Sequence, residues 1–238
     1  MRLTVLGMNG PFPAAGGATS GYLAEAGGKC IQLDMGSGVL GALTSYMAPE
    51  TLDALVLSHW HYDHACDVLP LLYRLEATGT EMHIYAPADE SSLIRQAVKS
   101  CRMAVLHDIA PGDEIDLGGV TIKVFAARHP VPAVMLRLTD GARTLCYTGD
   151  TNTVEGLTDF ASDADLLLAD GLFPQEMWAE GKPHLAAAQA AQMAADAGAK
   201  QLVITHLNPS IDPAGLLREA RSIRKDAVLA EKFRRFEV

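Results

Sequence analysis

The stretch SHWHYDHACD (58–67) holds three of the eight histidines of this 238-residue chain, together with two aspartates. It directly follows the apolar run LDALVL (52–57), so a short buried strand is expected to end where the histidines begin. Imidazole and carboxylate groups are good ligands for zinc and neighbouring divalent ions. A solvated turn, or histidines hydrogen-bonded in the core, is the alternative explanation of such a cluster.

Three further predicted strands end in residues of the same kind. The runs IKVFAAR (122–128), LCYTG (145–149) and LVIT (202–205) lead into His129, Asp150 and His206. In layered α/β folds, loops at the carboxyl ends of strands build sites on a rigid scaffold. The residues gathered there, the first four of them on a loop, are His59, His61, Asp63, His64, His129, Asp150 and His206. Seven ligands with one bridging carboxylate give each of two metals four protein ligands, which favours a metal site over the alternative.

The composition limits the class of protein. Apolar residues make up 49% of the chain and charged residues 20%, and no apolar run approaches the roughly 20 residues that cross a bilayer. We therefore expect a soluble globular protein, and the N-terminus lacks the pattern of a secretory signal. The four cysteines are scattered without a C-x-x-C pair, which predicts reduced thiols in the cytoplasm. The net charge of −10 argues mildly against broad binding to nucleic acid backbone.

The apolar patterns predict one α/β domain, residues 1–238, with helices covering both faces of central sheets. The predicted strands are 2–7, 21–26, 29–34, 52–58, 82–87, 120–128, 133–140, 142–149, 165–171 and 201–206. The predicted helices are 66–78, 89–99 and 184–199. No linker rich in proline, glycine or serine divides the chain.

HWHYDH (59–64) resembles the H-x-H-x-D-H signature of the metallo-β-lactamase superfamily. The resemblance spans nearly the whole chain, from the Gly-rich start through LDMGSGV (33–39) to THLNP (205–209). It implies the four-layer αββα sandwich of that family. By resemblance, His59, His61 and His129 hold a first metal, and Asp63, His64 and His206 hold a second. Asp150 would bridge the two. The implied ions are two Zn²⁺, with Mn²⁺ or Fe²⁺ left open.

The stretch KPHLAAAQAAQMAADAGAKQLVITH (182–206) resembles ribonuclease Z and related phosphodiesterases. The resemblance implies that His184 protonates the leaving group or stabilises charge on the phosphate; the alternative is that it caps the helix. The bridging position carries Asp150 rather than the cysteine of the familiar β-lactam-cleaving enzymes. His129 and Asp150 are only 21 positions apart, so the long arm with which ribonuclease Z grips tRNA is missing. A small phosphodiester or nucleotide-type substrate is therefore expected rather than tRNA, and the resemblance implies a homodimer.

The expected mechanism is attack on phosphorus by a hydroxide that bridges the two ions, with His184 as general acid. Asp63 is a ligand first, and a second role in orienting the nucleophile is a hypothesis. Hydrolysis of a lactone, thioester or β-lactam by the same hydroxide is the main alternative. A scaffold that keeps metal only for folding is the other.

Several residues near these motifs have two interpretations. Asp34 either accepts a hydrogen bond from a ligand imidazole or is a turn residue, and Asp170 either supports the site or simply ends a strand. Ser37, within GSG (36–38), is expected to belong to an ordinary turn. Arg95, together with Lys99 and Arg102, is expected to form a solvated basic patch.

Overall fold

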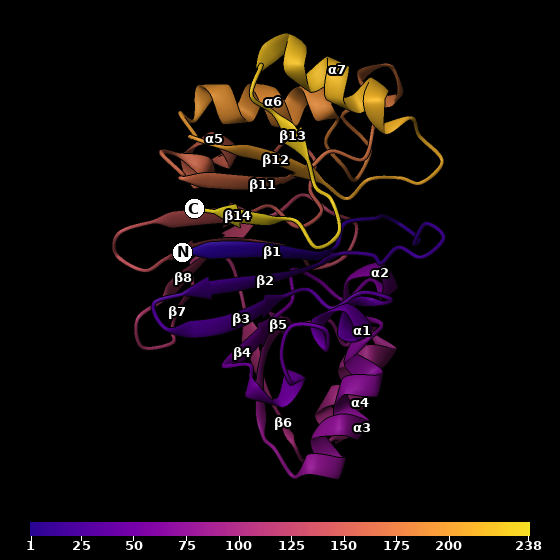
Figure 1. Cartoon of the computed structure of the whole chain (residues 1–238), viewed down its shortest axis with the longest axis vertical. Helices are drawn as coiled ribbons and strands as arrows, with labels where there is room; N and C mark the ends of the chain where they lie inside the picture. The colour runs from indigo at the N-terminus through magenta and orange to yellow at the C-terminus, as the bar shows by residue number, and fades with distance from the viewer.

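The fold consists of two seven-stranded sheets packed face to face, seen in a computed structural model that describes residues 1–238 (Figure 1). The first sheet contains, in spatial order, β14 (Arg235–Glu237), β1 (Arg2–Gly7), β2 (Gly21–Ala26), β3 (Lys29–Leu33), β4 (Ala54–Val56), β5 (Met82–Pro87) and β6 (Ala104–Ile109). The second contains β13 (Val228–Leu229), β12 (Leu202–Thr205), β11 (Leu166–Asp170), β10 (Thr144–Tyr147), β9 (Val134–Thr139), β8 (Thr121–Ala126) and β7 (Glu114–Asp116). Strands β3 to β6 run parallel, as do β10 to β13.

Helices cover the outer face of each sheet. Those on the first sheet are α1 (Val39–Leu43), α3 (Val68–Thr78) and α4 (Leu93–Ser100), and those on the second are α5 (Leu157–Ala161), α6 (Ala187–Asp196) and α7 (Pro213–Ile223). The remaining turns are α2 (Tyr62–Ala65) and the 3₁₀ turns η1 (Pro49–Thr51) and η2 (Gln175–Met177). This arrangement confirms the predicted four-layer αββα sandwich.

Three apolar cores hold the four layers together, one between the sheets and one under each set of helices. Strand β11 shows how a buried strand serves two of them. Leu166 and Leu168 enter the core between the sheets, whereas Leu167 and Ala169 enter the core beneath α6. Side chains alternate across a strand, so an uninterrupted apolar run is what a strand covered on both faces requires.

The predicted strands and helices all correspond to observed elements, but one detail around the signature is wrong. The sequence predicts a loop for Asp63 and His64, which lie instead in the one-turn helix α2. The backbone N–H of His64 donates to the carbonyl of His61 at 3.0 Å, so the signature coils immediately after the strand. Between His129 and Asp150 the chain forms only the antiparallel hairpin of β9 and β10 and short loops. No long arm is present.

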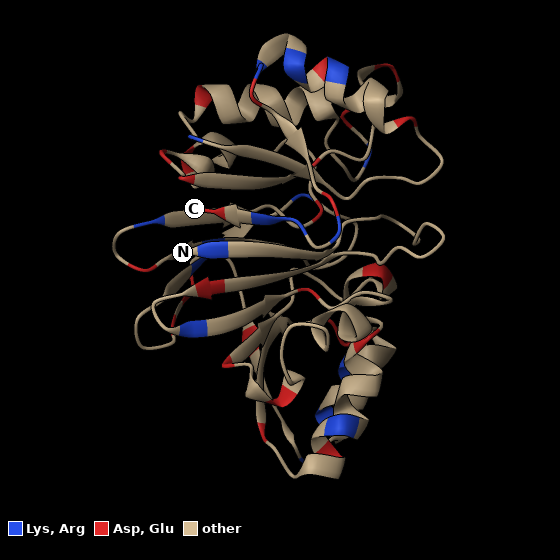
Figure 2. Ribbon diagram, in the orientation of Figure 1, with Lys and Arg blue, Asp and Glu red and all other residues tan.

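Charged side chains lie mainly on the helices, loops and strand ends (Figure 2). Arg95 corrects the expected basic patch, because it is 3% exposed and forms ion pairs with Glu90 and Asp108. No helix combines the length and the apolar character that a bilayer crossing requires.

Candidate metal centre

The seven candidate ligands converge at one edge of the sandwich, from both sheets. His59 and His61 lie on the loop that follows β4 of the first sheet, and α2 then supplies Asp63 and His64. The second sheet supplies the other three, from loops that follow β8, β10 and β12. Their ligand atoms form two groups in which all atoms lie within 4.8 Å of one another. The first group is His59, His61, His129 and Asp150, and the second is Asp63, His64, Asp150 and His206.

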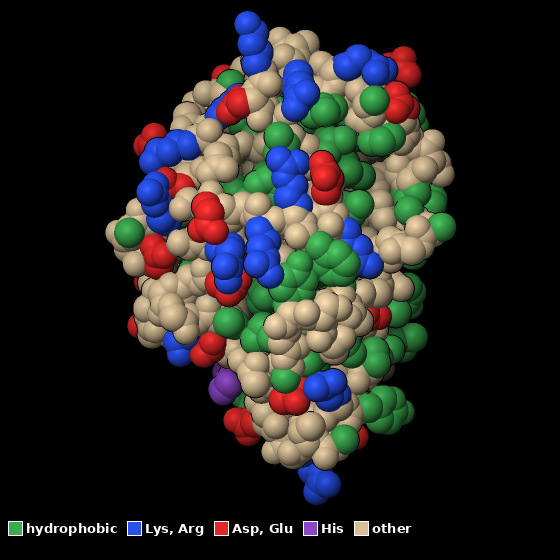
Figure 3. Space-filling view, viewed as in Figure 1, with side chains coloured by type: hydrophobic (Ala, Val, Ile, Leu, Met, Phe, Trp, Pro, Cys, Tyr) green, Lys and Arg blue, Asp and Glu red, His purple; other side chains and the backbone are tan.

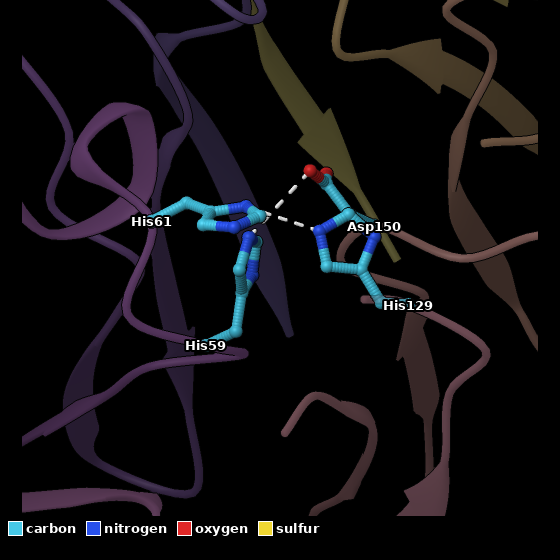
Figure 4. Close-up of side chains that lie close together, drawn as sticks. All are labelled: His59, His61, His129 and Asp150. Atoms are coloured by element: carbon cyan, nitrogen blue, oxygen red, sulfur yellow. Dashed lines mark hydrogen bonds and ion pairs between the residues drawn. The ribbon is translucent and has the colours of Figure 1, made fainter. Parts of the chain in front are cut away.

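The first group surrounds a common point (Figure 4). His61 Nδ1 lies 3.0 Å from His129 Nε2, and His59 Nε2 lies 3.6 Å from Asp150 Oδ2. Two ligand atoms at about 2.0–2.1 Å from one tetrahedral zinc ion are about 3.3–3.4 Å apart, so these separations suit a shared ion.

The second group is centred on the other oxygen of Asp150. His64 Nε2 lies 3.1 Å and His206 Nε2 lies 3.5 Å from Asp150 Oδ1, while Asp63 Oδ2 lies 3.1 Å from His206 Nε2. The two oxygens of Asp150 thus face different groups. This is the geometry a bridging carboxylate needs, and it gives the aspartate predicted from YTGD a place between the two groups.

Several atoms of the cluster are buried and have no hydrogen-bond partner. They include His59 Nε2, His64 Nε2 and Asp150 Oδ1. A buried polar atom left without a partner costs about 1–3 kcal/mol, and native structures rarely tolerate several in one place. Two divalent cations accepting these lone pairs would remove that cost, so the residues present fit a dinuclear metal site.

Hydrogen bonds on the far side of each ring determine which nitrogen faces the cluster. His64 Nδ1 donates to Asp34 Oδ2 at 2.7 Å, and His129 Nδ1 donates to the carbonyl of Pro183 at 3.2 Å. His59 Nδ1 lies 3.0 Å from Ser58 Oγ, which itself donates to Asp34 at 2.8 Å. The Nε2 atoms of these rings are therefore left as acceptors, as metal ligation requires.

Asp34 is the hub of this support, so the first of its two interpretations is the one the structure shows. It also accepts from the Ser58 backbone N–H at 2.7 Å and from the Tyr147 hydroxyl at 2.5 Å. Sequence reasoning missed Ser58 and Tyr147, since they lie 24 and 113 positions from Asp34 and share no motif with it.

The pKa shifts separate the two groups. Burial lowers the pKa of His59, His61 and His129, so these rings are neutral near pH 7 and have a lone pair to donate. Burial also acts to lower the pKa of His206, but Asp150, Asp170 and Asp63 outweigh it and raise the value to about 10. The same carboxylates would attract a metal cation, which would take the place of the ring proton.

His184 lies beside the cluster and is held by Asp170. His184 Nδ1 donates to Asp170 Oδ2 at 2.9 Å and lies 3.8 Å from Asp150 Oδ2. The Asp170 carboxylate is itself fixed by the backbone N–H groups of Leu172 and Thr151, at 3.1 and 3.3 Å. Asp170, His184, Asp150 and His206 form a third set of clustered groups, but Asp170 already accepts three hydrogen bonds and is better placed to position His184 than to bind an ion.

The backbone around the cluster is unusually constrained. Asp34 and His206 adopt positive φ angles of 51° and 59°, which non-glycine residues rarely do. Gly149, just before Asp150, has a φ of 53°, and a Cβ there would come within 2.6 Å of the Ser58 Cβ. Ser37 behaves as a turn residue, its carbonyl accepting from the Thr19 backbone N–H at 3.0 Å. The close approach of Gly149 to Ser58 brings a loop of the second sheet against a loop of the first beside the cluster.

A two-sheet sandwich with clustered histidines and aspartates at its strand ends defines a metallo-hydrolase of the β-lactamase fold. A family model described as "Beta-lactamase superfamily domain" matches residues 34–207. The chain belongs to this family.

Individual relatives agree with this assignment. The chain is 35% identical over 228 residues to "Probable metallo-hydrolase YhfI" of Bacillus subtilis (strain 168), covering 94% of this chain and 93% of that protein. The crystal structure of YhfI superposes with a TM-score of 0.92 over 100% of this chain and 98% of that one, at 31% identity. Ribonuclease Z of Methanosarcina acetivorans is 24% identical, with 100% of this chain and 98% of that protein covered. Human tRNase Z, short form, shares the fold with a TM-score of 0.82, at 20% identity and with 100% and 99% of the two chains covered.

Proposed function

We propose that this metallo-hydrolase is a phosphodiesterase with a dinuclear metal site, and that the ions are Zn²⁺ in preference to Mn²⁺ or Fe²⁺. Three imidazoles and a carboxylate around the first ion form a ligand set typical of zinc. The proposed ligands are His59, His61, His129, Asp63, His64 and His206, with Asp150 between the two ions.

The observation that carries the proposal is the position of His184. Its Nδ1–H is committed to Asp170, so Nε2 is the atom available to a leaving oxygen. A general acid must lie within hydrogen-bond reach of the atom that it protonates, and His184 borders the cluster on which a phosphate would lie. A hydrolase that breaks a bond to an alkoxide leaving group gains most from such an acid.

The chain's residues divide the work of the reaction. Two ions held by these residues would supply positive charge for the phosphate oxygens and would lower the pKa of a bound water. Asp170 orients His184, and His184 transfers a proton from Nε2 to the leaving oxygen. Asp63, whose Oδ2 contacts His206, is proposed to orient the attacking water in addition to ligating an ion.

A small substrate fits this chain better than tRNA. The names of two relatives, ribonuclease Z and tRNase Z, point to phosphodiester substrates. However, the segment between His129 and Asp150 is here a hairpin without a long arm. On the face drawn in Figure 3, Lys and Arg are interspersed with Asp and Glu rather than gathered into a basic stripe. We therefore propose a small phosphodiester or nucleotide as the substrate.

The test combines metal analysis with turnover of bis(p-nitrophenyl) phosphate. We expect about two ions per chain and measurable hydrolysis by the wild type. His184→Ala is expected to keep its metal and lose about 10²–10⁴-fold in kcat. His83→Ala, which changes a histidine on β5 away from the cluster, is the matched control and is expected to keep full activity.

Two outcomes would contradict the proposal. A metal-loaded wild type that hydrolyses lactones or thioesters but no phosphodiester would make the protein a carbonyl hydrolase. Metal without turnover of any ester would favour a structural role for the ions. Equal loss of metal and activity in His184→Ala would move that residue from proton transfer to ligation.

Three broader predictions accompany the function. We propose that residues 1–238 form one domain, because strands from both sheets share the core between them. A homodimer and a location in the cytoplasm also stay predictions. Sedimentation of the purified protein tests the first of these two, and cell fractionation the second.

A further inference from the structure

A pocket of about 230 Å³ opens directly beside the candidate metal centre. Three loops form it: the one after β4, the one that joins β5 to α4, and the one after β8. His61, a candidate ligand of the first ion, is part of its wall. A substrate whose phosphate lies over the cluster would therefore extend into this pocket on the His61 side.

Two large apolar side chains of this pocket are mostly exposed to solvent. Tyr62 is 65% exposed and Leu93 is 66% exposed, and both line the pocket, with Val131 from the second sheet. Tyr62 stands between two candidate ligands, His61 and Asp63, at the start of α2. A flat aromatic face placed there is available to stack on a planar ring.

A second wall of the pocket is formed by residues 87–92, which join β5 to α4, and hydrogen bonds hold this segment at both ends. The buried Trp60 donates from Nε1 to the carbonyl of Pro87 at 2.7 Å. At the other end, Ser92 caps α4 by accepting from the Arg95 backbone N–H at 3.2 Å, and the buried Arg95 pairs with Glu90. A pocket whose loops are fixed before binding spends little binding energy on ordering them.

The polar groups of the pocket indicate which part of a substrate it takes. No lysine or arginine lines it, and Asp89 contributes a carboxylate. Asp89 Oδ1 accepts from the backbone N–H and hydroxyl of Ser91, at 3.0 and 2.6 Å, and Oδ2 accepts no hydrogen bond. An acidic pocket repels a phosphate but accepts a neutral group that carries N–H or O–H donors.

We infer that this pocket binds the nucleoside part of a nucleotide-type substrate, with the base stacked on Tyr62 and Asp89 accepting from its amino or hydroxyl groups. The inference rests on the proposed function for the placement of the phosphate at the metal centre. It narrows the proposed substrate from a small phosphodiester or nucleotide to a phosphodiester that carries a nucleobase.

The experiment measures equilibrium binding of two probes to the zinc-loaded protein by calorimetry. Adenosine 5′-monophosphate carries both base and phosphate, and ribose 5-phosphate lacks the base. We expect the first probe to bind about ten- to hundredfold more tightly than the second, from stacking of one base. Tyr62→Ala is expected to abolish that preference while leaving the affinity for ribose 5-phosphate and the metal content unchanged.

Two variants serve as controls. Tyr62→Phe keeps the aromatic face and is expected to keep the preference. Tyr73→Ala removes another exposed tyrosine, 77% exposed on α3 and outside this pocket, and is expected to change nothing.

The outcomes separate this inference from the proposed function. Equal affinity for the two probes in the wild type, no binding of adenosine 5′-monophosphate at millimolar concentration, or a preference that survives Tyr62→Ala each overturn the nucleoside pocket. If the preference is present but bis(p-nitrophenyl) phosphate and nucleotide diesters are not hydrolysed, the pocket stands and the phosphodiesterase proposal fails.

Discussion

Strand β11 runs between two buried aspartates whose surroundings differ completely. Asp165, just before the strand, accepts hydrogen bonds from Arg143, Lys200 and the Thr144 backbone N–H, each at 2.9 Å. At the other end, Asp170 lies against the cluster, where Asp150 Oδ1 and His206 Nδ1 have no partner.

The difference shows where the chain balances its own buried charge and where it does not. At the Asp165 end, cationic side chains and a backbone N–H group supply hydrogen bonds and positive charge to the carboxylate. Burial acts to raise the pKa of Asp165, but these hydrogen bonds outweigh it and lower the pKa to about 2. At the cluster the chain supplies lone pairs and carboxylates without enough donors. A buried site left in this state is complementary to a cation.

Removal of metal is expected to have the largest effect on activity and on thermal stability. Chelation should abolish hydrolysis and lower Tm by about 10 °C or more, since a ligand present at a thousandfold excess over its Kd contributes on the order of 4 kcal/mol. Calorimetry before and after treatment with a chelator measures the shift, and added Zn²⁺ should reverse it. An unchanged Tm would mean that the cluster is stable without ions.

The second largest effect is expected from substitution of Asp150, compared with the same kind of change at Asp165. Asp150→Ala should reduce bound metal from about two ions per chain to one or none and lower kcat/KM by at least about 10³-fold. Asp165→Asn, the matched change at the other end of β11, should retain both ions and full activity. Metal analysis of the two purified variants decides this, and equal metal content would contradict a bridging Asp150.

Loss of the supporting hydrogen bond at His64 should have a smaller effect. Asp34→Asn removes the carboxylate that fixes this ring and is expected to weaken metal affinity by about 10–100-fold. Competition with a chromophoric chelator measures the change. Asp170→Asn, which supports His184 instead, should lower kcat with little change in affinity; the opposite pattern would exchange the roles assigned to the two aspartates.

The smallest effect concerns the stability of the fold in acid, through the hydrogen-bonded carboxylate of Asp165. Because the folded pKa of Asp165 is about 2 and the unfolded value is close to 3.9, its contribution is present above about pH 4 and lost as the pH falls through about 2. Asp165→Asn should therefore lower the free energy of unfolding by about 2 kcal/mol at pH 7, and the difference should shrink toward pH 2. Urea titrations of chelator-treated wild type and variant test this, and a pH-independent difference would contradict it.

Sequence patterns predicted the strands of this fold better than its edges. Apolar runs such as DLLLADG (165–171) are long enough to identify a strand buried on both faces. Of the four edge strands, β7, β13 and β14 have only two or three residues each and carry no such pattern. The fourth, the six-residue β6, was not predicted either. The sequence does carry a start signal for α7: Asp212 precedes Pro213, and its carboxylate accepts from the N–H groups of Ala214 and Gly215.

In the candidate site, too, some residues could be predicted from the sequence and others could not. The ligand-type residues could be predicted because each directly follows a strand and the H-x-H-x-D-H spacing is compact. Neither Ser58 nor Tyr147 could be predicted from spacing. The Ser58 contact with Asp34 forms only when β3 and β4 pair in the first sheet, and the Tyr147 contact forms only after the two sheets have packed together. The Tyr62 pocket likewise depends on three loops from both sheets, and no spacing in the sequence indicates it.

The most direct test of the central claim is anomalous scattering at the zinc edge from crystals of the zinc-loaded protein. The account predicts two peaks, one among His59, His61 and His129 and the other among Asp63, His64 and His206, with Asp150 between them. Peaks located elsewhere, or none at this edge of the sandwich, would contradict it.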